Sequence, residues 1–246
     1  MQENGVSFSV ADSAAWAPGL DTPEAWASWA HAPFPIAGND EPGVRQMPAM
    51  LRRRAGFLGK MALEVAYRCI GDHTDIPVVF CSRHGEVARA VELLSDLAQD
   101  APLSPTAFGL AVHNASAGLF SIARGDRANH VAVAAGPSSV EHAVIEACGL
   151  LADGADKVLL VSYDDRLPQV FAAYEDCEEQ PHAWAWLMTP SGDNPTRLSW
   201  RAAADEACEE SSSMPASLQV LRFHLRGDRA LERTAGRLRW RWTTGG

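Results

Sequence analysis

The sequence lacks the residue patterns of a disulfide framework, a metal site or a nucleotide-binding loop. Its five cysteines, at positions 69, 81, 148, 177 and 208, include no CxxC pair and are odd in number. Such a set is typical of a reducing compartment. The eight histidines form no HExxH motif or Cys/His cluster, and neither a GxGxxG nor a P-loop motif occurs. We therefore expect no metal, no cofactor and a cytoplasmic location.

Positive charge and long apolar runs are also scarce. The 21 Lys and Arg residues face 31 Asp and Glu, so the formal net charge is −10. No stretch approaches the roughly 18 apolar residues that a membrane-spanning helix needs, and no basic region followed by an apolar run opens the chain. These absences predict a protein with no membrane span and no signal peptide. The acidic balance argues against a nucleic-acid partner.

Apolar residues are abundant enough for one large core. The chain has 246 residues, of which 47% are hydrophobic. A chain of this size can bury its apolar residues in a single α/β domain. We expect residues 1–246 to form one domain.

The periodicity of the apolar residues predicts alternating strands and helices. Strands are expected at 76–81, 130–135 and 157–163, with helices at 86–99 and 139–152. This alternation is typical of a parallel sheet with helices on both faces. Further strands are expected at 6–10, 183–188, 196–202 and 237–242, and further helices at 50–70 and 215–225. The fold class is therefore α/β, with a mixed but largely parallel sheet covered by helices.

Five short segments in the middle of the chain give it a family resemblance. In order, they are Ser104-Pro105-Thr106, Phe108, His113-Asn114, Ala117-Gly118 and Ala135-Gly136-Pro137-Ser138-Ser139. Together they resemble the N-terminal half of the β-ketoacyl synthases, and the best-matched core spans residues 105–164. The resemblance implies a thiolase-like fold in a single truncated domain, with the second half of that fold lost or trimmed.

The last of these segments lies where the family has its nucleophile. In the β-ketoacyl synthases a strand runs into an elbow of the form Ala-Cys-Xaa-Ser-Ser, which a helix follows. Matching the paired serines, Ser138 and Ser139, puts Gly136 at the position of the cysteine. Acyl transfer needs a thiolate there, and glycine offers no side chain. The family's His-Gly-Thr motif is also missing, so the resemblance implies a chain that does not catalyse condensation by itself.

The resemblance also implies a partner and a role. Short proteins of this kind are similar to those of aryl polyene and related type II fatty acid or polyketide clusters. There the role resembles that of a chain length factor, which pairs with a catalytic β-ketoacyl synthase and serves an acyl carrier protein. Tunnel or interface positions would be Phe108, His113, Asn114, Ala117 and Gly118, and a structural role for His113 and Asn114 is equally open. We expect a subunit interface either on the sheet face that the missing half would normally cover or at residues 129–135.

Two other functions stay open on the residues alone. A thioesterase or decarboxylase acting on acyl carrier protein substrates would use Ser138, with His142 nearby, or Cys81, with His84 nearby. We instead expect Ser138 and Ser139 to cap the helix that follows them. A stand-alone carrier protein binding module would use the basic cluster at 52–54, which is otherwise a solvated helix face.

Overall fold

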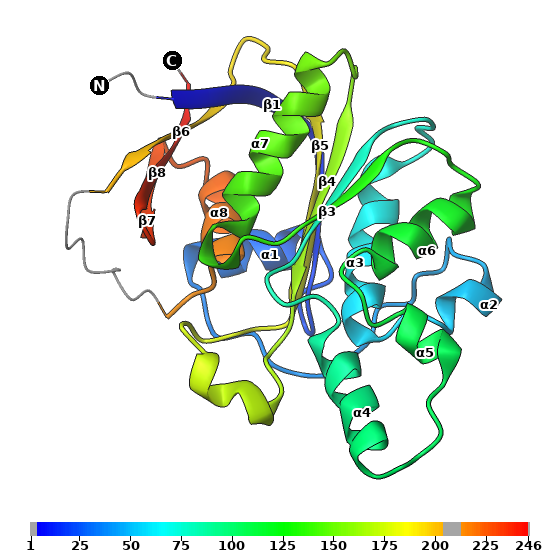
Figure 1. The fold of residues 1–246 in the computed structure, drawn as a ribbon. Helices are drawn as coiled ribbons and strands as arrows, with labels where there is room; N and C mark the ends of the chain where they lie inside the picture. The colour runs from blue at the N-terminus through cyan, green and yellow to red at the C-terminus, as the bar shows by residue number, and fades with distance from the viewer. Residues whose placement is uncertain (1–3, 204–212, 246) are drawn as a thin grey trace.

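The computed structural model describes residues 4–203 and 213–245, and its centre is one eight-stranded sheet. The strand order is β3-β2-β4-β5-β1-β6-β8-β7. Helices lie on both faces of the first five strands, and the last three form the other end of the sheet (Figure 1). None of the helices in the described part of the chain has the length and apolar character needed to cross a membrane.

The seven expected strands and the expected helices are present, although β1 is longer than predicted and one helix is divided. The strands are β1 (Asn4–Trp16), β2 (Val78–Cys81), β3 (His130–Val133), β4 (Val158–Asp164), β5 (His182–Thr189), β6 (Thr196–Ala202), β7 (Ala230–Ala235) and β8 (Leu238–Thr244). The helices are α1 (Pro23–His31), α2 (Ala49–Arg52), α3 (Phe57–Ile70), α4 (Val87–Ala98), α5 (Pro105–Gly109), α6 (Ala115–Arg124), α7 (Ser139–Ala152) and α8 (Ala216–Arg226), with 3-10 turns η1 (Gly136–Ser138) and η2 (Gln169–Tyr174). The sequence did not predict β7.

The prediction of a largely parallel sheet was wrong. Only β2 pairs in parallel, with β3 on one side and β4 on the other. The pairs β4–β5, β5–β1, β1–β6, β6–β8 and β8–β7 are all antiparallel. The expected strand–helix–strand unit exists, because α7 connects β3 to β4. No α-helix separates β4 from β5 or β5 from β6, so the chain turns back without the crossover that parallel pairing needs.

The expected helix at 50–70 is divided in two. It consists of α2, which ends at Arg52, and α3, which begins at Phe57. Gly56 occupies the N-cap of α3 in an extended conformation, and the helix cannot run through a residue with that backbone geometry. The break separates Arg53 and Arg54, which are exposed, from the buried face of α3.

Strand β1 joins the two ends of the sheet. Its first half pairs with β6 from Asn4↔Trp200 to Phe8↔Thr196, and its second half pairs with β5 down to Trp16↔Ala183. A bulge lies between Val10 and Asp12. An extra residue at a bulge changes which face the following side chains occupy. Phe8 accordingly packs into one core and Trp16 into the other.

The sheet separates two apolar cores. Helices α1, α7 and α8 cover one face over a core that includes Phe8, Trp184, Trp186, Trp240 and Trp242, and α3 and α6 cover the other. Every residue of β4 is buried, and its side chains alternate between the two cores. The face that packs against α7 is also covered by α1 and α8, and Trp240 and Trp242 of β8 contribute to the same core.

Candidate functional site

The expected elbow is a turn between β3 and α7. Gly136 begins the 3-10 turn η1 with a φ of 55°, a left-handed conformation that favours glycine. It is exposed, and a Cβ atom placed on it would meet no atom within 4 Å. The surroundings of Gly136 thus leave room for a side chain, but its left-handed backbone disfavours residues other than glycine. No nucleophile stands at this position.

The two serines of the elbow are bound within the protein. The Ser139 hydroxyl donates to the Gly136 carbonyl at 2.8 Å and accepts from the Ala135 N–H at 2.9 Å. The Ser138 hydroxyl accepts from Trp240 Nε1 at 3.0 Å. Our expectation that they cap α7 is not met, because Ser138 is at the N-cap without a side-chain cap hydrogen bond. His142 binds the Ser138 carbonyl at 2.9 Å, so its imidazole is not placed as a base for the hydroxyl.

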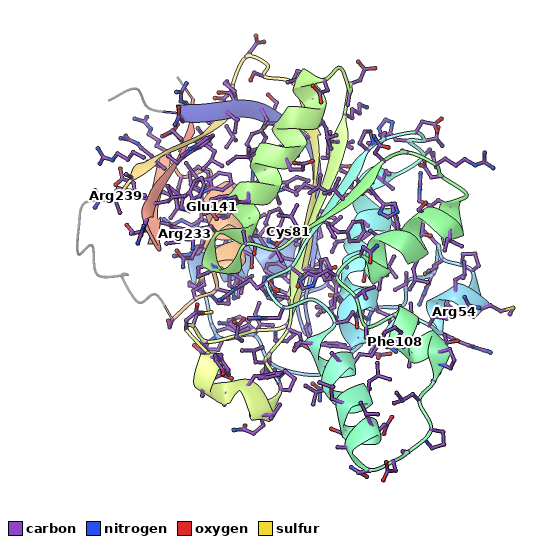
Figure 2. All side chains as sticks on the ribbon, viewed as in Figure 1. Arg54, Cys81, Phe108, Glu141, Arg233 and Arg239 are labelled. Atoms are coloured by element: carbon purple, nitrogen blue, oxygen red, sulfur yellow. The ribbon has the colours of Figure 1, made fainter. Side chains whose placement is uncertain are left out.

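A buried ion pair fastens the C-terminal hairpin to the elbow. Glu141, in the first turn of α7, is 0% exposed and pairs with Arg233 of β7 (Figure 2). Arg233 also donates to the Pro137 carbonyl at 3.1 Å, and Trp242 Nε1 donates to Glu141 at 3.4 Å. Together with the Trp240 bond to Ser138, these contacts tie β7 and β8 to η1 and α7. We call Glu141, Arg233, Trp240 and Trp242 the elbow clamp.

The five candidate tunnel or interface residues do not converge on one site. Phe108 is 70% exposed, whereas Ala117 is fully buried in the core under α6. Asn114 is exposed, and Gly118 is half-buried with open space beside it. The His113 ring packs against Gly85, and its carbonyl accepts from the Tyr163 hydroxyl at 3.2 Å. The structure therefore places Phe108 and Asn114 at the surface, whereas Ala117 lies in the core and His113 packs against Gly85.

The family is decided by a match over most of the chain. The family model described as "Beta-ketoacyl synthase, N-terminal domain" matches residues 26–243. The chain belongs to the β-ketoacyl synthase N-terminal domain family. The suspected resemblance is thus confirmed, and so is a ketosynthase-like α/β fold. No curated protein matches the sequence.

Solved structures of synthase complexes share the fold of this family member. A chain in the complex of a ketosynthase (ApeO) with its chain length factor (ApeC) from Xenorhabdus doucetiae is 28% identical, with a TM-score of 0.84 over 97% of this chain and 99% of that one. The ishigamide ketosynthase/chain length factor is 16% identical, with a TM-score of 0.65 over 82% and 68% of the two chains. A type II polyketide synthase acyl-carrier protein in complex with its ketosynthase contains a chain that is 10% identical, with a TM-score of 0.65 and 100% of both chains covered.

Cys81, the other candidate nucleophile in this synthase relative, is sealed in the core. It is 1% exposed at the end of β2, and burial raises the pKa of its thiol well above the usual value. The neighbouring Arg83 and His84 turn away from it toward Glu179, at 3.1 and 3.2 Å. A thiol in this environment is protonated and inaccessible.

The acidic segment after η2 surrounds a cation of the protein itself. Asp176, Cys177 and Glu179 bring their ligand atoms within 4.8 Å of one another, as a metal site would. The Arg83 guanidinium contacts all three, at 2.7 Å from Asp176, 3.3 Å from Cys177 and 3.1 Å from Glu179. Arg83 thus supplies the positive charge that a metal ion would bring.

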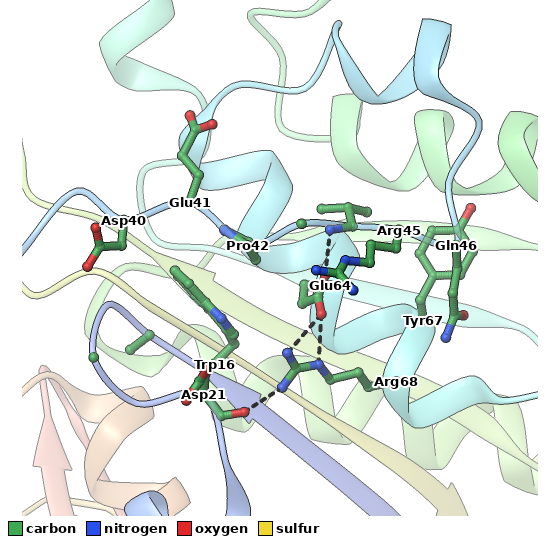
Figure 3. Close-up of a pocket in the computed structure, with 14 residues that line it drawn as sticks. Trp16, Asp21, Asp40, Glu41, Pro42, Arg45, Gln46, Glu64, Tyr67 and Arg68 are labelled. Atoms are coloured by element: carbon green, nitrogen blue, oxygen red, sulfur yellow. Dashed lines mark hydrogen bonds and ion pairs between the residues drawn. The ribbon is translucent and has the colours of Figure 1, made fainter.

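A polar pocket of about 650 Å³ lies beside α3 (Figure 3), the helix that packs on the opposite face of the sheet from α7. Its inner charges pair with each other. Glu64 accepts from the Val44 N–H at 2.7 Å and pairs with Arg68 at 2.8 Å, and Arg68 donates to the Asp21 carbonyl at 2.9 Å. No sequence pattern indicated this pocket, because its walls come from three separate segments, at 16–21, 40–46 and 64–68.

The elbow clamp predicts a large loss of stability when one charge is removed. Arg233→Met leaves the Glu141 carboxylate buried without its cation, and such changes cost about 3–5 kcal/mol. Urea unfolding monitored by tryptophan fluorescence measures the change. The double variant Arg233→Met/Glu141→Leu removes both charges, so it should recover most of the loss. Equal stability of wild type and Arg233→Met would show that the pair does not hold the hairpin.

Asp164 at the end of β4 predicts a pH dependence of folding. Burial raises its pKa to about 7, although the Ser82 hydroxyl and the Arg83 N–H donate to it. Because this folded pKa lies above the unfolded value of 3.8, the group's contribution to stability is complete below 3.8 and is lost as the pH rises through 7. Asp164→Asn keeps an acceptor oxygen and loses the titration. The free energy of unfolding of the variant, relative to that of wild type, should therefore rise by about 3 kcal/mol between pH 5 and pH 8.

Urea unfolding of both proteins at the two pH values measures this difference. Taking wild type minus variant cancels the titration of the other groups. An identical pH dependence in the two proteins would contradict the raised pKa of Asp164.

Proposed function

We propose that this chain is a non-catalytic, chain-length-factor-like subunit that forms a heterodimer with a catalytic β-ketoacyl-ACP synthase. Its pathway would be aryl polyene or related type II fatty acid or polyketide biosynthesis. The observation that carries this proposal is the elbow, where Gly136 replaces the nucleophile and the elbow clamp binds the neighbouring groups. Such a subunit would contribute a surface and a tunnel wall instead of a reactive group.

The free edge of the sheet supports the pairing. Among the strands that the structure describes, β3 is the last on its side, pairs with β2 alone, and has no fully buried residue. An edge strand presents unpaired N–H and C=O groups that a strand of another chain can bond. The edge coincides with residues 129–135, where the sequence led us to expect an interface.

Exposed apolar side chains on the helices between β2 and β3 give further support, and one of these helices, α6, contacts β3. They lie on α4, α5, α6 and the connections between them (Figure 1). The set is Leu94 (61% exposed), Leu97 (57%), Leu103 (43%), Phe108 (70%), Val112 (45%) and Ile122 (66%). None of the residues of α4 is buried. Exposed apolar clusters of this kind mark surfaces that another protein covers.

The hydrolytic alternative has little support from these contacts. The hydroxyl of Ser138 is bonded to Trp240, and the thiol of Cys81 is buried and protonated. We also infer that residues 1–246 act as one domain. Strand β1 supports this inference because it pairs with both β5 and β6.

The pairing predicts that charge on the exposed apolar surface blocks the heterodimer. Coexpression with the catalytic synthase of the native host, affinity purification and mass spectrometry measure the complex. We expect a stoichiometric synthase with wild type and a loss of at least about tenfold in affinity with Phe108→Glu/Ile122→Glu. Val170→Glu/Tyr174→Glu is the matched control, because it adds the same two charges at apolar positions that are 67% and 75% exposed on η2. Elution of the wild-type chain as a monomer beside an active, self-sufficient synthase would overturn the proposal.

Carrier protein binding predicts a role for the exposed arginines after α2. An acyl carrier protein is acidic, so Arg53→Glu/Arg54→Glu should weaken its binding by about tenfold at low salt. Titration calorimetry with the host's carrier protein measures this. Arg127→Glu/Arg229→Glu changes the net charge equally at two other exposed positions. Equal affinities of the two double variants and wild type would leave the basic cluster as a solvated surface.

A further inference from the structure

The outer face of the C-terminal end of the sheet holds a cluster of arginines. Arg197 and Arg201 lie on β6, and Arg239 and Arg241 lie on β8. The register sets Ser199 opposite Arg241 and Arg201 opposite Arg239, so all four arginine side chains share one face. The intervening residues Leu198, Trp240 and Trp242 point into the core. We call these four residues the arginine face.

The charge of this face is opposite to that of the chain. Four arginines and Glu232 of β7, which faces Arg241, sum to +3, whereas the whole chain has a formal charge of −10. Arg241 pairs with Glu232 at 3.7 Å, with both side chains about half exposed. The described residues offer no salt bridge to the other three arginines. Their charge is therefore directed outward, and Arg239 points away from the body of the molecule (Figure 2).

The pairing within the face is unfavourable without a counter-charge. Arg201 and Arg239 are direct cross-strand partners. Like charges at directly opposite positions have Cβ atoms about 5 Å apart and destabilise a sheet. A carboxylate placed between two such guanidinium groups reverses the sign of this interaction, because each can donate charge-assisted hydrogen bonds to it. The arrangement thus fits an anionic ligand that spans neighbouring strands.

We propose that the arginine face docks an acidic segment of another protein. Extended polyanions reach well beyond the roughly 10 Å over which salt screens charge at moderate ionic strength. Nucleic acid or an anionic membrane would therefore meet the negative charge of the rest of the chain as well. A short acidic segment contacts this face alone, and the charge asymmetry of the molecule would orient it there.

The arginine face lies apart from the surface proposed for pairing with a synthase. Arg239 and Phe108 are on opposite sides of the molecule in Figure 2. Both surfaces can thus be occupied at the same time. The proposal does not depend on the heterodimer, since it rests on the register and charges of β6, β8 and β7.

Fluorescence anisotropy with a labelled oligoglutamate peptide tests the proposal on the full chain. We expect binding that weakens steeply with added salt and that falls by at least about tenfold in Arg201→Glu/Arg239→Glu. Arg45→Glu/Arg166→Glu is the matched control, because it makes the same change in net charge at exposed positions elsewhere. This control should bind the peptide within about twofold of wild type.

A stability measurement shows whether the variants remain folded. Arg201→Glu alone places a carboxylate opposite Arg239, so its melting temperature should be equal to or about 2 °C above that of wild type. A folded Arg201→Glu/Arg239→Glu variant that binds oligoglutamate as wild type does would overturn the proposal.

Three further results would also overturn it. The first is tighter binding of duplex DNA than of oligoglutamate, and the second is tighter binding of phosphatidylserine vesicles. The third is peptide binding that occurs only after Asp205, Glu206, Glu209 and Glu210 are changed to their amides, because the chain's own acidic residues would then be the occupant.

Discussion

The contact between Arg233 and Glu141 determines how the C-terminal hairpin of β7 and β8 meets the elbow and α7. Two opposite charges removed from water need further hydrogen bonds, and the Pro137 carbonyl and the Trp242 indole provide them. Each of these groups comes from a different element, so the contact fixes η1, α7, β7 and β8 together. Ser138 and Ser139, which follow the elbow glycine, are thereby part of the interior packing, whereas Gly136 itself stays exposed and offers no reactive group.

The local structure could be read from the sequence, but the strand directions could not. The apolar runs at 130–135 and 157–163 and the helical pattern between them correctly predicted β3, α7 and β4. Periodicity reports which side chains share a face, and it contains no information on the direction of neighbouring strands. Strand β7 was missed because Glu232, Arg233 and Thr234 follow one another without the apolar alternation of a half-buried strand. The Arg233 side chain is nevertheless only 9% exposed, since the charge of Glu141 compensates it.

The site was predictable only where it is local in sequence. The order of short motifs located the elbow at Gly136, and the structure places it between β3 and α7 as expected. No sequence pattern joins Glu141 to residues almost a hundred positions later, so the elbow clamp was found only in three dimensions. For the same reason, the motif containing Ala117 and Gly118 did not show that these neighbours on α6 have different surroundings, one in the core and one at its margin.

The position of β1 has a consequence for the order in which the chain can fold. Its first residue pairs with Trp200, so the centre of the sheet consists of contacts between the beginning of the chain and its last third. Contacts so distant in sequence close slowly, because the loop entropy must be overcome before they form. During synthesis, β2, β3 and β4 can associate while Phe8 and Trp16 still lack their partner strands. Folding of this protein is therefore completed late, after translation has delivered β5 and β6 to an N-terminal strand made long before them.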